Sequence, residues 1–246
     1  MPGASDDILR CLDSFGLEWD GPVTFQSREE AAYQAAIDAL SDQGLIFRCA
    51  CSRSDIARNS ANPAIYPGTC RHSTVSERQS HALRIRVPDE VITVADHLQG
   101  AFEQDLACSV GDFVIKRRDQ LFAYHLATVI DDAALGVTDV MRGVDLLDST
   151  PRQIYLQRCL DLAMPRYAHL PVLVDAAGNK LSKQTGATAV QGKDASSALL
   201  RLLSLMRHEV PANLIGAGVP ELLTWAIAHW DASRLAGIAT IPAGPS

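Results

Sequence analysis

Apolar residues recur every three or four positions in several stretches of the sequence, which is the spacing of one face of an α-helix. The first stretch, residues 5–15, places Ile8, Leu9, Leu12 and Phe15 on one face. Similar stretches predict helices over residues 27–44, 121–130, 150–163, 194–206 and 221–230.

Helix-capping residues support two of these predictions. Ser27 and Glu30 have the spacing of a capping box, and Gly44 is suited to end the same helix. Thr150 followed by Pro151 predicts the cap and first position of a later helix.

Alternating or short apolar runs predict the strands. Residues 82–87 alternate strictly and residues 91–94 follow after Pro88, so we expect these two runs to form a half-buried hairpin. The tail from Ala236 is rich in Ala, Gly and Pro and is expected to fray. Further strands are predicted at residues 45–47, 112–116, 137–141 and 171–175. Strands that alternate with helices around an inserted hairpin indicate an α/β fold with a parallel core and an insertion.

Composition and charge narrow the class without defining a function. The chain has 246 residues, of which 47% are hydrophobic and 21% charged, as in a globular protein. Its net charge is −7, so any contact with RNA requires a local basic patch. No apolar run has the length of a membrane span, and the first residues do not resemble a signal peptide. We therefore expect a cytoplasmic protein whose six cysteines are thiols or metal ligands.

Three cysteines lie close together in the sequence. Cys49 and Cys51 form a Cys-x-Cys pair, and Cys70 follows 19 residues after the second. A turn at Pro67–Gly68 can return Cys70 to the pair, so that the three thiolates share one cation. A tetrahedral zinc site needs a fourth ligand, for which His72 is the general candidate; three buried thiols without metal are the alternative. The other cysteines have no such neighbours and are expected in the core: Cys11, Cys108 and Cys159.

Two lysines flank a serine in the run Lys180-Leu-Ser-Lys-Gln184. Mobile ammonium groups in a short loop can follow a polyphosphate as charge moves along it, although an ordinary solvated turn has the same composition. We therefore predict catalytic roles for Lys180, Ser182 and Lys183.

Arg142 follows a predicted strand and precedes Gly143. Open α/β sheets bind ligands at the carboxyl ends of their strands, and the planar arginine fork fits a carboxylate. A single arginine is also a common surface charge. We predict structural roles for Asp131 and Asp132, as adjacent residues of a strand, and packing or nucleotide-edge roles for His125 and His169.

Several segments together resemble a known family. Residues 122–132, 137–146 and 167–171 precede the lysine loop in this order. With Lys180–Gln184 in the place of a KMSKS loop, the series resembles the catalytic core of class I glutamyl-tRNA synthetases, above all their short glutamyl-queuosine tRNA(Asp) paralogues. The resemblance runs from about Met1 to about Trp230.

The resemblance implies a Rossmann-like class I catalytic core, truncated at its N-terminus, with a zinc-binding insertion and a short helical C-terminal part. It divides the chain into residues 1–44 and 112–192 as the halves of the core, 45–111 as the acceptor-stem-type insertion, and 193–246 as C-terminal helices and tail.

The resemblance also implies roles for individual residues. Tyr124 and Arg142 match substrate-contacting positions for glutamate, and Lys183 matches the lysine that binds ATP. Cys49, Cys51, Tyr66 and Cys70 match the pattern C-x-C…Y-x3-C. In this pattern, the tyrosine oxygen is the fourth ligand of a structural zinc.

The implied activity is ATP-dependent activation of L-glutamate, with Mg²⁺, and transfer to the queuosine base of tRNA(Asp) by a monomer that binds no membrane. The alternatives are a truncated glutamyl-tRNA synthetase that charges the tRNA 3′ end, and a non-catalytic, zinc-containing RNA-binding remnant. The printed sequence contains no HIGH motif, whose histidines would stabilise the reacting phosphate. Met1 therefore resembles an internal methionine, and we expect the chain as printed to be inactive and its sheet to have an uncovered edge.

Overall fold

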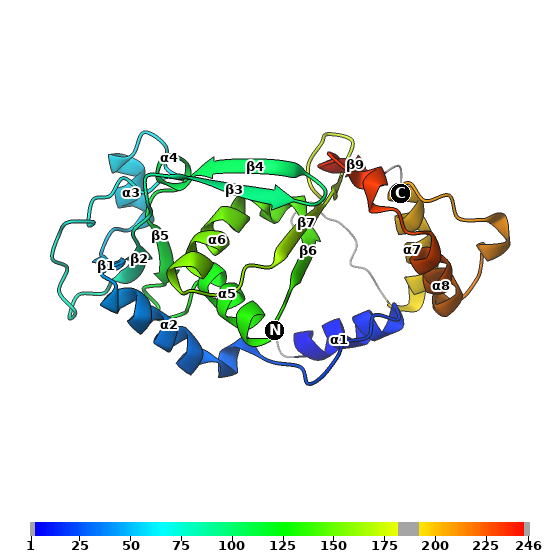
Figure 1. The fold of residues 1–246 in the computed structure, drawn as a ribbon, viewed down its shortest axis with the longest axis horizontal. Helices are drawn as coiled ribbons and strands as arrows, with labels where there is room; N and C mark the ends of the chain where they lie inside the picture. The colour runs from blue at the N-terminus through cyan, green and yellow to red at the C-terminus, as the bar shows by residue number, and fades with distance from the viewer. Residues whose placement is uncertain (1–2, 182–191, 244–246) are drawn as a thin grey trace. The chain divides into compact units, whose positions relative to one another are not determined.

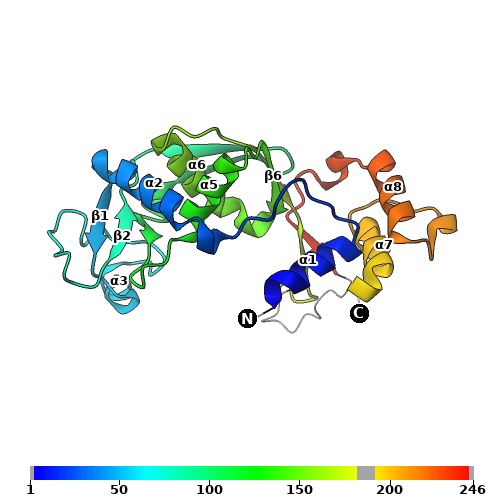
Figure 2. The same ribbon diagram turned by 90° about the horizontal axis from the view of Figure 1, so that it is seen from below.

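The computed structural model describes residues 3–181 and 192–243 and divides into two compact units. Residues 24–169 form the larger unit; residues up to 23 and from 170 onward form the smaller one. Figures 1 and 2 show their elements from two directions.

An antiparallel three-stranded sheet lies at one end of the larger unit. Its order is β1 (Ile46–Cys49), β2 (Ala82–Ile85) and β5 (Phe113–Lys116). Both pairings are antiparallel, and the second contains a register shift after Leu83. β1 therefore ends at Cys49, the first cysteine of the pair, two residues before Cys51.

A mixed four-stranded sheet forms the rest of the β structure of this unit. Its order is β4 (Gly100–Asp105), β3 (Val91–Asp96), β7 (Arg166–Leu170) and β6 (Asp139–Gly143). β3 pairs with β4 in an antiparallel hairpin and with β7 in parallel. The predicted hairpin between residues 82–87 and 91–94 is therefore wrong, because these runs enter different sheets.

Three helices cover the sheets and supply much of the core. They are α2 (Glu30–Asp42), α5 (Tyr124–Ala134) and α6 (Thr150–Cys159). α6 packs against β3 and α5, and α5 also contacts α2 (Figure 1). The fully buried side chains at their contacts include Leu40, Ile92, Leu126 and Leu156. Burying each such side chain stabilises the fold by about 1.5–3 kcal/mol.

The helix ends differ from their predictions in two places. α2 begins at Glu30 with Glu29 as its N-cap, so the predicted Ser27–Glu30 capping box is wrong; a 3₁₀ turn occupies Gln26–Arg28 instead. Ser149 is the N-cap of α6, and the hydroxyl of Thr150 is used in the interior. Gly44, with φ +70°, follows α2 as expected.

The remaining described elements of the larger unit are short. α3 (Arg53–Asn59) and α4 (Leu106–Ser109) follow β1 and β4 respectively. A 3₁₀ helix at Val144–Ser149 connects β6 to α6. Only this 3₁₀ helix separates the end of β6 at Gly143 from the start of α6 at Thr150.

The smaller unit combines helices with a two-stranded parallel sheet. Its helices are α1 (Ala4–Ser14), α7 (Ala195–Leu205) and α8 (Val219–His229), and β8 (Val172–Val174) pairs with β9 (Thr240–Pro242). Its 3₁₀ helices are Gly192–Asp194, Ala212–Leu214 and Ala232–Leu235. The tail was predicted to fray, but its residues 240–242 form β9, and Ile241 is buried.

α1 forms over almost the predicted residues. On its apolar face Leu9 and Phe15 are half-buried, whereas Ile8 is 61% and Leu12 37% exposed. Within residues 3–181 and 192–243, no helix is both long and apolar enough to cross a membrane.

Candidate functional site

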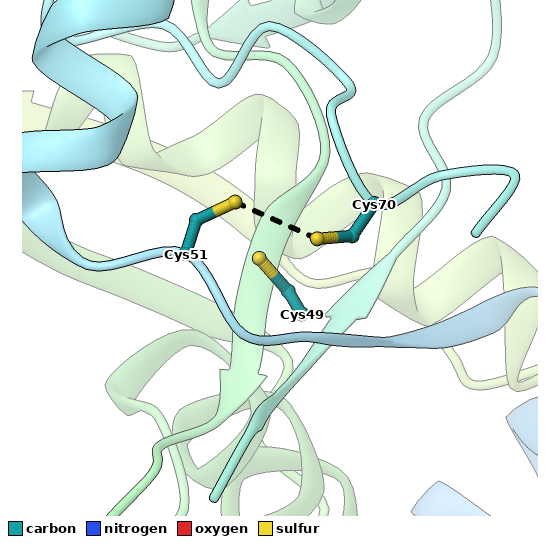
Figure 3. A group of neighbouring side chains, drawn as sticks. All are labelled: Cys49, Cys51 and Cys70. Atoms are coloured by element: carbon teal, nitrogen blue, oxygen red, sulfur yellow. Dashed lines mark hydrogen bonds between the residues drawn. The ribbon is translucent and has the colours of Figure 1, made fainter. Parts of the chain in front are cut away.

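The three clustered cysteines come together at the end of β1. Cys49 is the last residue of the strand, Cys51 lies in the following loop, and Cys70 comes from the loop before β2 (Figure 3). Their sulfur atoms all lie within 4.8 Å of one another, and the Sγ atoms of Cys51 and Cys70 are 3.5 Å apart. Sulfur atoms at these separations can coordinate one ion.

Tyr66 places an oxygen atom beside this cluster. Its hydroxyl oxygen lies 3.4 Å from Cys49 Sγ and accepts a 2.7 Å hydrogen bond from the Cys70 N–H. The side chain is buried, and the guanidinium carbon of Arg84 lies 3.9 Å from the centre of its ring. The phenol is thus fixed between the sulfur of Cys49 and the backbone N–H of Cys70.

The surroundings affect the ionisation of these groups differently. Burial raises the pKa of Cys51 to about 12 and raises the pKa of the Tyr66 hydroxyl. Burial also tends to raise the pKa of Cys49. Hydrogen bonds with Tyr66, the Cys51 backbone and Arg84 oppose this effect and together lower the pKa of Cys49 below its usual value. Metal ligands must be deprotonated, so a bound cation would stabilise the thiolate forms that burial disfavours.

A capping box fixes the chain directly after Cys51. Ser52 is the N-cap of α3: its side chain accepts from the Asp55 N–H at 3.1 Å, and the Ser52 N–H donates to Asp55 at 2.8 Å. The Ser-x-x-Asp spacing is visible in the sequence, although no helix was predicted at this position. It holds the loop that carries Cys51.

The outcomes for the other candidate ligands are mixed. His72 is exposed and does not belong to the cluster of three cysteines. Cys11 and Cys159 are half-buried, whereas Cys108 is exposed, so its predicted core position is wrong. Three sulfurs and the adjacent phenol oxygen are a suitable donor set for zinc.

Arg142 lies in β6 and is held by uncharged groups. Its Nε–H donates to His169 Nε2 at 3.1 Å, and its NH2 group donates to Thr150 Oγ1 and Gln153 Oε1, both at 2.7 Å. The Tyr167 ring centre lies 5.6 Å from its guanidinium carbon. Thr150, Gln153 and His169 are all buried.

No carboxylate within the described ranges forms a salt bridge with Arg142. Asp132 is an acidic group near Arg142. Burial raises the pKa of Asp132, and the positive charge of Arg142 lowers it by a smaller amount. Three buried nitrogens nearby also lack a hydrogen-bond partner among the described residues: His125 Nδ1, Arg152 Nε and Gln153 Nε2. The surroundings of Arg142 therefore favour an anionic, hydrogen-bonding ligand.

Tyr124 and His125 begin α5. Tyr124 is 50% exposed, and its ring centre lies 5.5 Å from that of His125 in an edge-to-face arrangement. Burial, together with the charges of Arg152 and Arg142, lowers the pKa of His125 to about 4. Arg142 and Arg152 therefore produce a positive electrostatic potential at the N-terminus of α5, where Tyr124 is exposed to solvent.

The acidic pair Asp131 and Asp132 lies in α5, so the strand geometry assumed for it is wrong. Asp131 accepts hydrogen bonds from Tyr33 and Gln26, each at 2.7 Å, which fits the structural role predicted for it. His169, for which a packing or nucleotide-edge role was predicted, is completely buried.

The lysine loop is described only at its start. β8 leads into a turn whose Asp175 accepts from the Ala177 and Asn179 N–H groups at 2.9 Å, and Lys180 forms an antiparallel bridge with Val174. Ser182, Lys183 and Gln184 lie outside the described residues.

The fold has close counterparts among solved structures. A glutamate tRNA ligase from Elizabethkingia meningosepticum, in complex with its amino acid, superposes with a TM-score of 0.76 at 19% identity, covering 98% of this chain and 57% of that one. A glutamate-tRNA synthetase from Elizabethkingia anophelis gives the same score and identity, covering 98% and 58%. The fold is therefore the α/β catalytic fold of class I tRNA synthetases, as predicted.

Sequence comparison defines the family more narrowly. Residues 1–208 match the model of the class I tRNA synthetase (E and Q) catalytic domain. The glutamyl-Q tRNA(Asp) synthetase of Chromobacterium violaceum is 47% identical to this chain, and the match covers 100% of this chain and 80% of the relative. The protein of the same name from Methylococcus capsulatus is 51% identical, and the match covers 94% of this chain and 76% of the relative. The chain belongs to the glutamyl-Q tRNA(Asp) synthetase family.

Proposed function

We propose that the protein uses ATP to activate L-glutamate and then transfers the glutamyl group to the queuosine base at the wobble position of tRNA(Asp). Membership of the family supports the reaction. The observation that carries the substrate proposal is Arg142: a part-buried guanidinium with neutral acceptors and no carboxylate partner among the described residues.

In the first step, a carboxylate oxygen of glutamate attacks the α-phosphorus of Mg²⁺-bound ATP and pyrophosphate leaves. Arg142 would bind the side-chain carboxylate, and Tyr124, exposed at the start of α5, would contact the same substrate. Fixing the second carboxylate in this way selects a dicarboxylic amino acid and orients its α-carboxylate for attack.

Lys180, Ser182 and Lys183 are proposed to act on the ATP phosphates. Negative charge develops on the leaving pyrophosphate, and an ammonium group placed there stabilises the transition state more than the ground state. In any preparation that catalyses glutamate-dependent pyrophosphate exchange, Lys183→Ala should lower the rate about a hundredfold, since one such contact is worth ~3 kcal/mol.

In the second step, a hydroxyl of the queuosine cyclopentenediol attacks the glutamyl-adenylate, forming an ester and releasing AMP. The segment from residue 45 to residue 87 contains seven arginines and only two acidic residues in a chain of net charge −7. Arg53 and Arg78 in this segment are exposed. We propose that this local positive charge contacts tRNA phosphates.

We also propose that Cys49, Cys51, Cys70 and Tyr66 hold a structural zinc ion. A closed set of four protein ligands leaves no position for substrate, so the ion would stabilise the fold of this arginine-rich segment and take no part in the reaction. Its contribution to the function is to maintain the surface that contacts tRNA.

The transfer experiment separates the proposal from its alternatives. Labelled glutamate is supplied with ATP and with tRNA(Asp) that carries or lacks queuosine. Label on the modified tRNA alone supports the proposal. Label at the 3′ end of either tRNA would indicate a glutamyl-tRNA synthetase instead, and tRNA binding without adenylate formation would indicate a non-catalytic module.

Pyrophosphate exchange with glutamate and ATP tests the first step, with the Chromobacterium violaceum relative as the positive control. Exchange by the 246-residue chain supports the proposal, whereas its absence with tRNA binding retained favours the non-catalytic alternative. Cytoplasmic location and a monomeric state remain predictions, which fractionation and light scattering can test.

A further inference from the structure

A buried chain of hydrogen bonds connects Asp96 to Arg142. The Asp96 and His169 side chains are completely buried, and Asp96 Oδ2 lies 2.5 Å from His169 Nδ1. The other ring nitrogen, Nε2, lies 3.1 Å from Arg142 Nε. The three residues come from β3, β7 and β6, which are adjacent strands of one sheet.

The hydrogen bonds of Asp96 determine where the His169 proton lies. Asp96 Oδ1 accepts from the backbone N–H groups of Leu98 at 2.9 Å, Gln99 at 2.8 Å and His169 at 3.2 Å. Oδ2 is left to face Nδ1, so Nδ1 must carry the proton in order to donate. Nε2 is then without a proton and can accept from Arg142, as the distance between them requires.

His169 in turn restricts the orientation of Arg142. An arginine has five N–H bonds in one plane. Three of them are used, one by His169 and two by the side chains of Thr150 and Gln153. For the two N–H bonds of NH1, no acceptor is recorded among the described residues. Since three bonds fix the plane of the guanidinium, the direction of NH1 is fixed as well.

We propose that Asp96 and His169 are positioning residues of the amino-acid site: Asp96 selects the His169 tautomer that accepts from Arg142, which leaves NH1 for the side-chain carboxylate of the ligand. The proposal rests on the assignment of glutamate to Arg142. It assigns His169 no proton-transfer role. A guanidinium that is oriented before binding loses less conformational freedom when the ligand arrives, and the affinity is correspondingly higher.

Asp96→Asn tests this directly because the two side chains have nearly the same shape. Three backbone N–H groups require an oxygen at the position of Oδ1, so the new amide must place its NH2 group toward His169. Nδ1 then has to accept, the proton moves to Nε2, and an N–H bond points at the Arg142 Nε–H. The substitution thus replaces an attractive contact with a repulsive one while the volume is unchanged.

His169→Gln is the matched conservative variant. A glutamine amide can donate its NH2 group to Asp96 and present its oxygen to Arg142, so it preserves both contacts. Asp105→Asn is the control for a general effect of removing an aspartate charge from this region. Asp105 caps α4 and takes no part in the hydrogen bonds that connect Asp96, His169 and Arg142.

The first readout is nuclear magnetic resonance of the 246-residue protein with ¹⁵N-labelled histidine and arginine. We expect the His169 proton on Nδ1 in the original protein and in Asp105→Asn, and on Nε2 in Asp96→Asn. The Arg142 Nε–H should exchange slowly with solvent in the original protein and in His169→Gln, and at least tenfold faster in Asp96→Asn.

The second readout is calorimetric titration with L-glutamate, with L-glutamine as the probe that lacks the carboxylate. Asp96→Asn should weaken glutamate binding at least tenfold, His169→Gln less than threefold, and the control not at all. Weak binding of glutamine in all four proteins would show that the affinity reports the carboxylate contact.

The outcomes distinguish this inference from the proposed function. A proton on Nε2 in the original protein, or on Nδ1 in Asp96→Asn with glutamate binding unchanged, overturns the inference. If the original protein binds glutamate no better than glutamine, the assignment of Arg142 to glutamate fails, while the tautomer and the Arg142 exchange rate still decide whether Asp96 positions the guanidinium.

Discussion

Gly111 lies directly against the backbone of Tyr66, the residue proposed as the fourth metal ligand. A Cβ atom at position 111 would collide with the Tyr66 carbonyl oxygen and lie 3.0 Å from its nitrogen. The Tyr66 N–H donates to the carbonyl of Val110 at 3.1 Å. The loop between α4 and β5 therefore supports the segment that carries the phenol, across a separation of more than forty residues.

Gly111→Ala is expected to destabilise the protein by more than Gly100→Ala. Both glycines have positive φ angles, +69° and +78°, so both variants incur backbone strain. A Cβ at Gly100 meets no atom within 4 Å, so the difference isolates the collision with Tyr66. We expect a difference of about 1–3 kcal/mol in the free energy of unfolding by urea. Equal losses in the two variants would show that the backbone of Tyr66 moves aside without cost.

The purified protein is expected to contain about one zinc ion per chain. Cys49→Ser and Cys70→Ser should each release it and unfold the surrounding segment, since binding energy at a structural site is largely folding energy. Tyr66→Phe should weaken metal binding while the three thiolates remain. Elemental analysis of protein prepared without chelator measures the stoichiometry.

Cys108→Ser is the control for these variants, because Cys108 is exposed and outside the cluster. It should retain the full metal content. His72→Ala should also retain it. Loss of metal from His72→Ala but not from Tyr66→Phe would identify the histidine as the fourth ligand.

Arg142→Ala is expected to weaken L-glutamate binding by about ten- to a hundredfold, because hydrogen bonds to charged groups contribute about 1.5–3 kcal/mol. Arg166→Ala is the control: Arg166 lies on the neighbouring strand, is exposed and pairs with Asp139. Calorimetric titration of both variants measures the affinities. Similar weakening in the two would indicate a general charge effect in place of a specific contact.

His125 should make the protein less stable as the pH falls. Its folded pKa is lowered to about 4 from 6.5 by burial and by the charges of Arg152 and Arg142. Between these values the unfolded chain binds a proton that the folded chain does not, so stability decreases from about pH 6.5 downward. The loss between pH 7 and pH 5 is at most about 2 kcal/mol.

Urea unfolding at the two pH values checks this prediction. His125→Leu should remove that part of the pH dependence, whereas His72→Gln, at an exposed histidine, should leave it in place. An unchanged pH dependence in His125→Leu would assign the effect to another group.

Local signals in the sequence were sufficient for most helices and for the metal cluster. Periodic apolar residues predicted α1, α5, α7 and α8 to within a few residues. The Cys-x-Cys pair with a later cysteine predicted three sulfurs that do meet. These features depend on neighbours in the sequence, which pattern and spacing record directly.

Pairing between distant strands was not predictable in the same way. Alternation showed that residues 82–87 and 91–94 are half-buried strands, but it does not specify a partner, and the short Pro88 turn suggested the wrong one. β3 is instead paired with β4, which follows it, and with β7. The contact between Asp96 and His169 depends on this parallel pairing, so no local pattern could have revealed it.

The parallel pairing of β8 with β9 has a consequence for synthesis on the ribosome. Val172 pairs with Thr240, close to the end of the printed chain, whereas the larger unit is complete once residue 169 has been made. During translation, β8 therefore lacks its partner strand until β9 has left the exit tunnel. The smaller unit therefore completes its fold after the larger one, and Lys180, which pairs with Val174 of β8, reaches its final environment only with it.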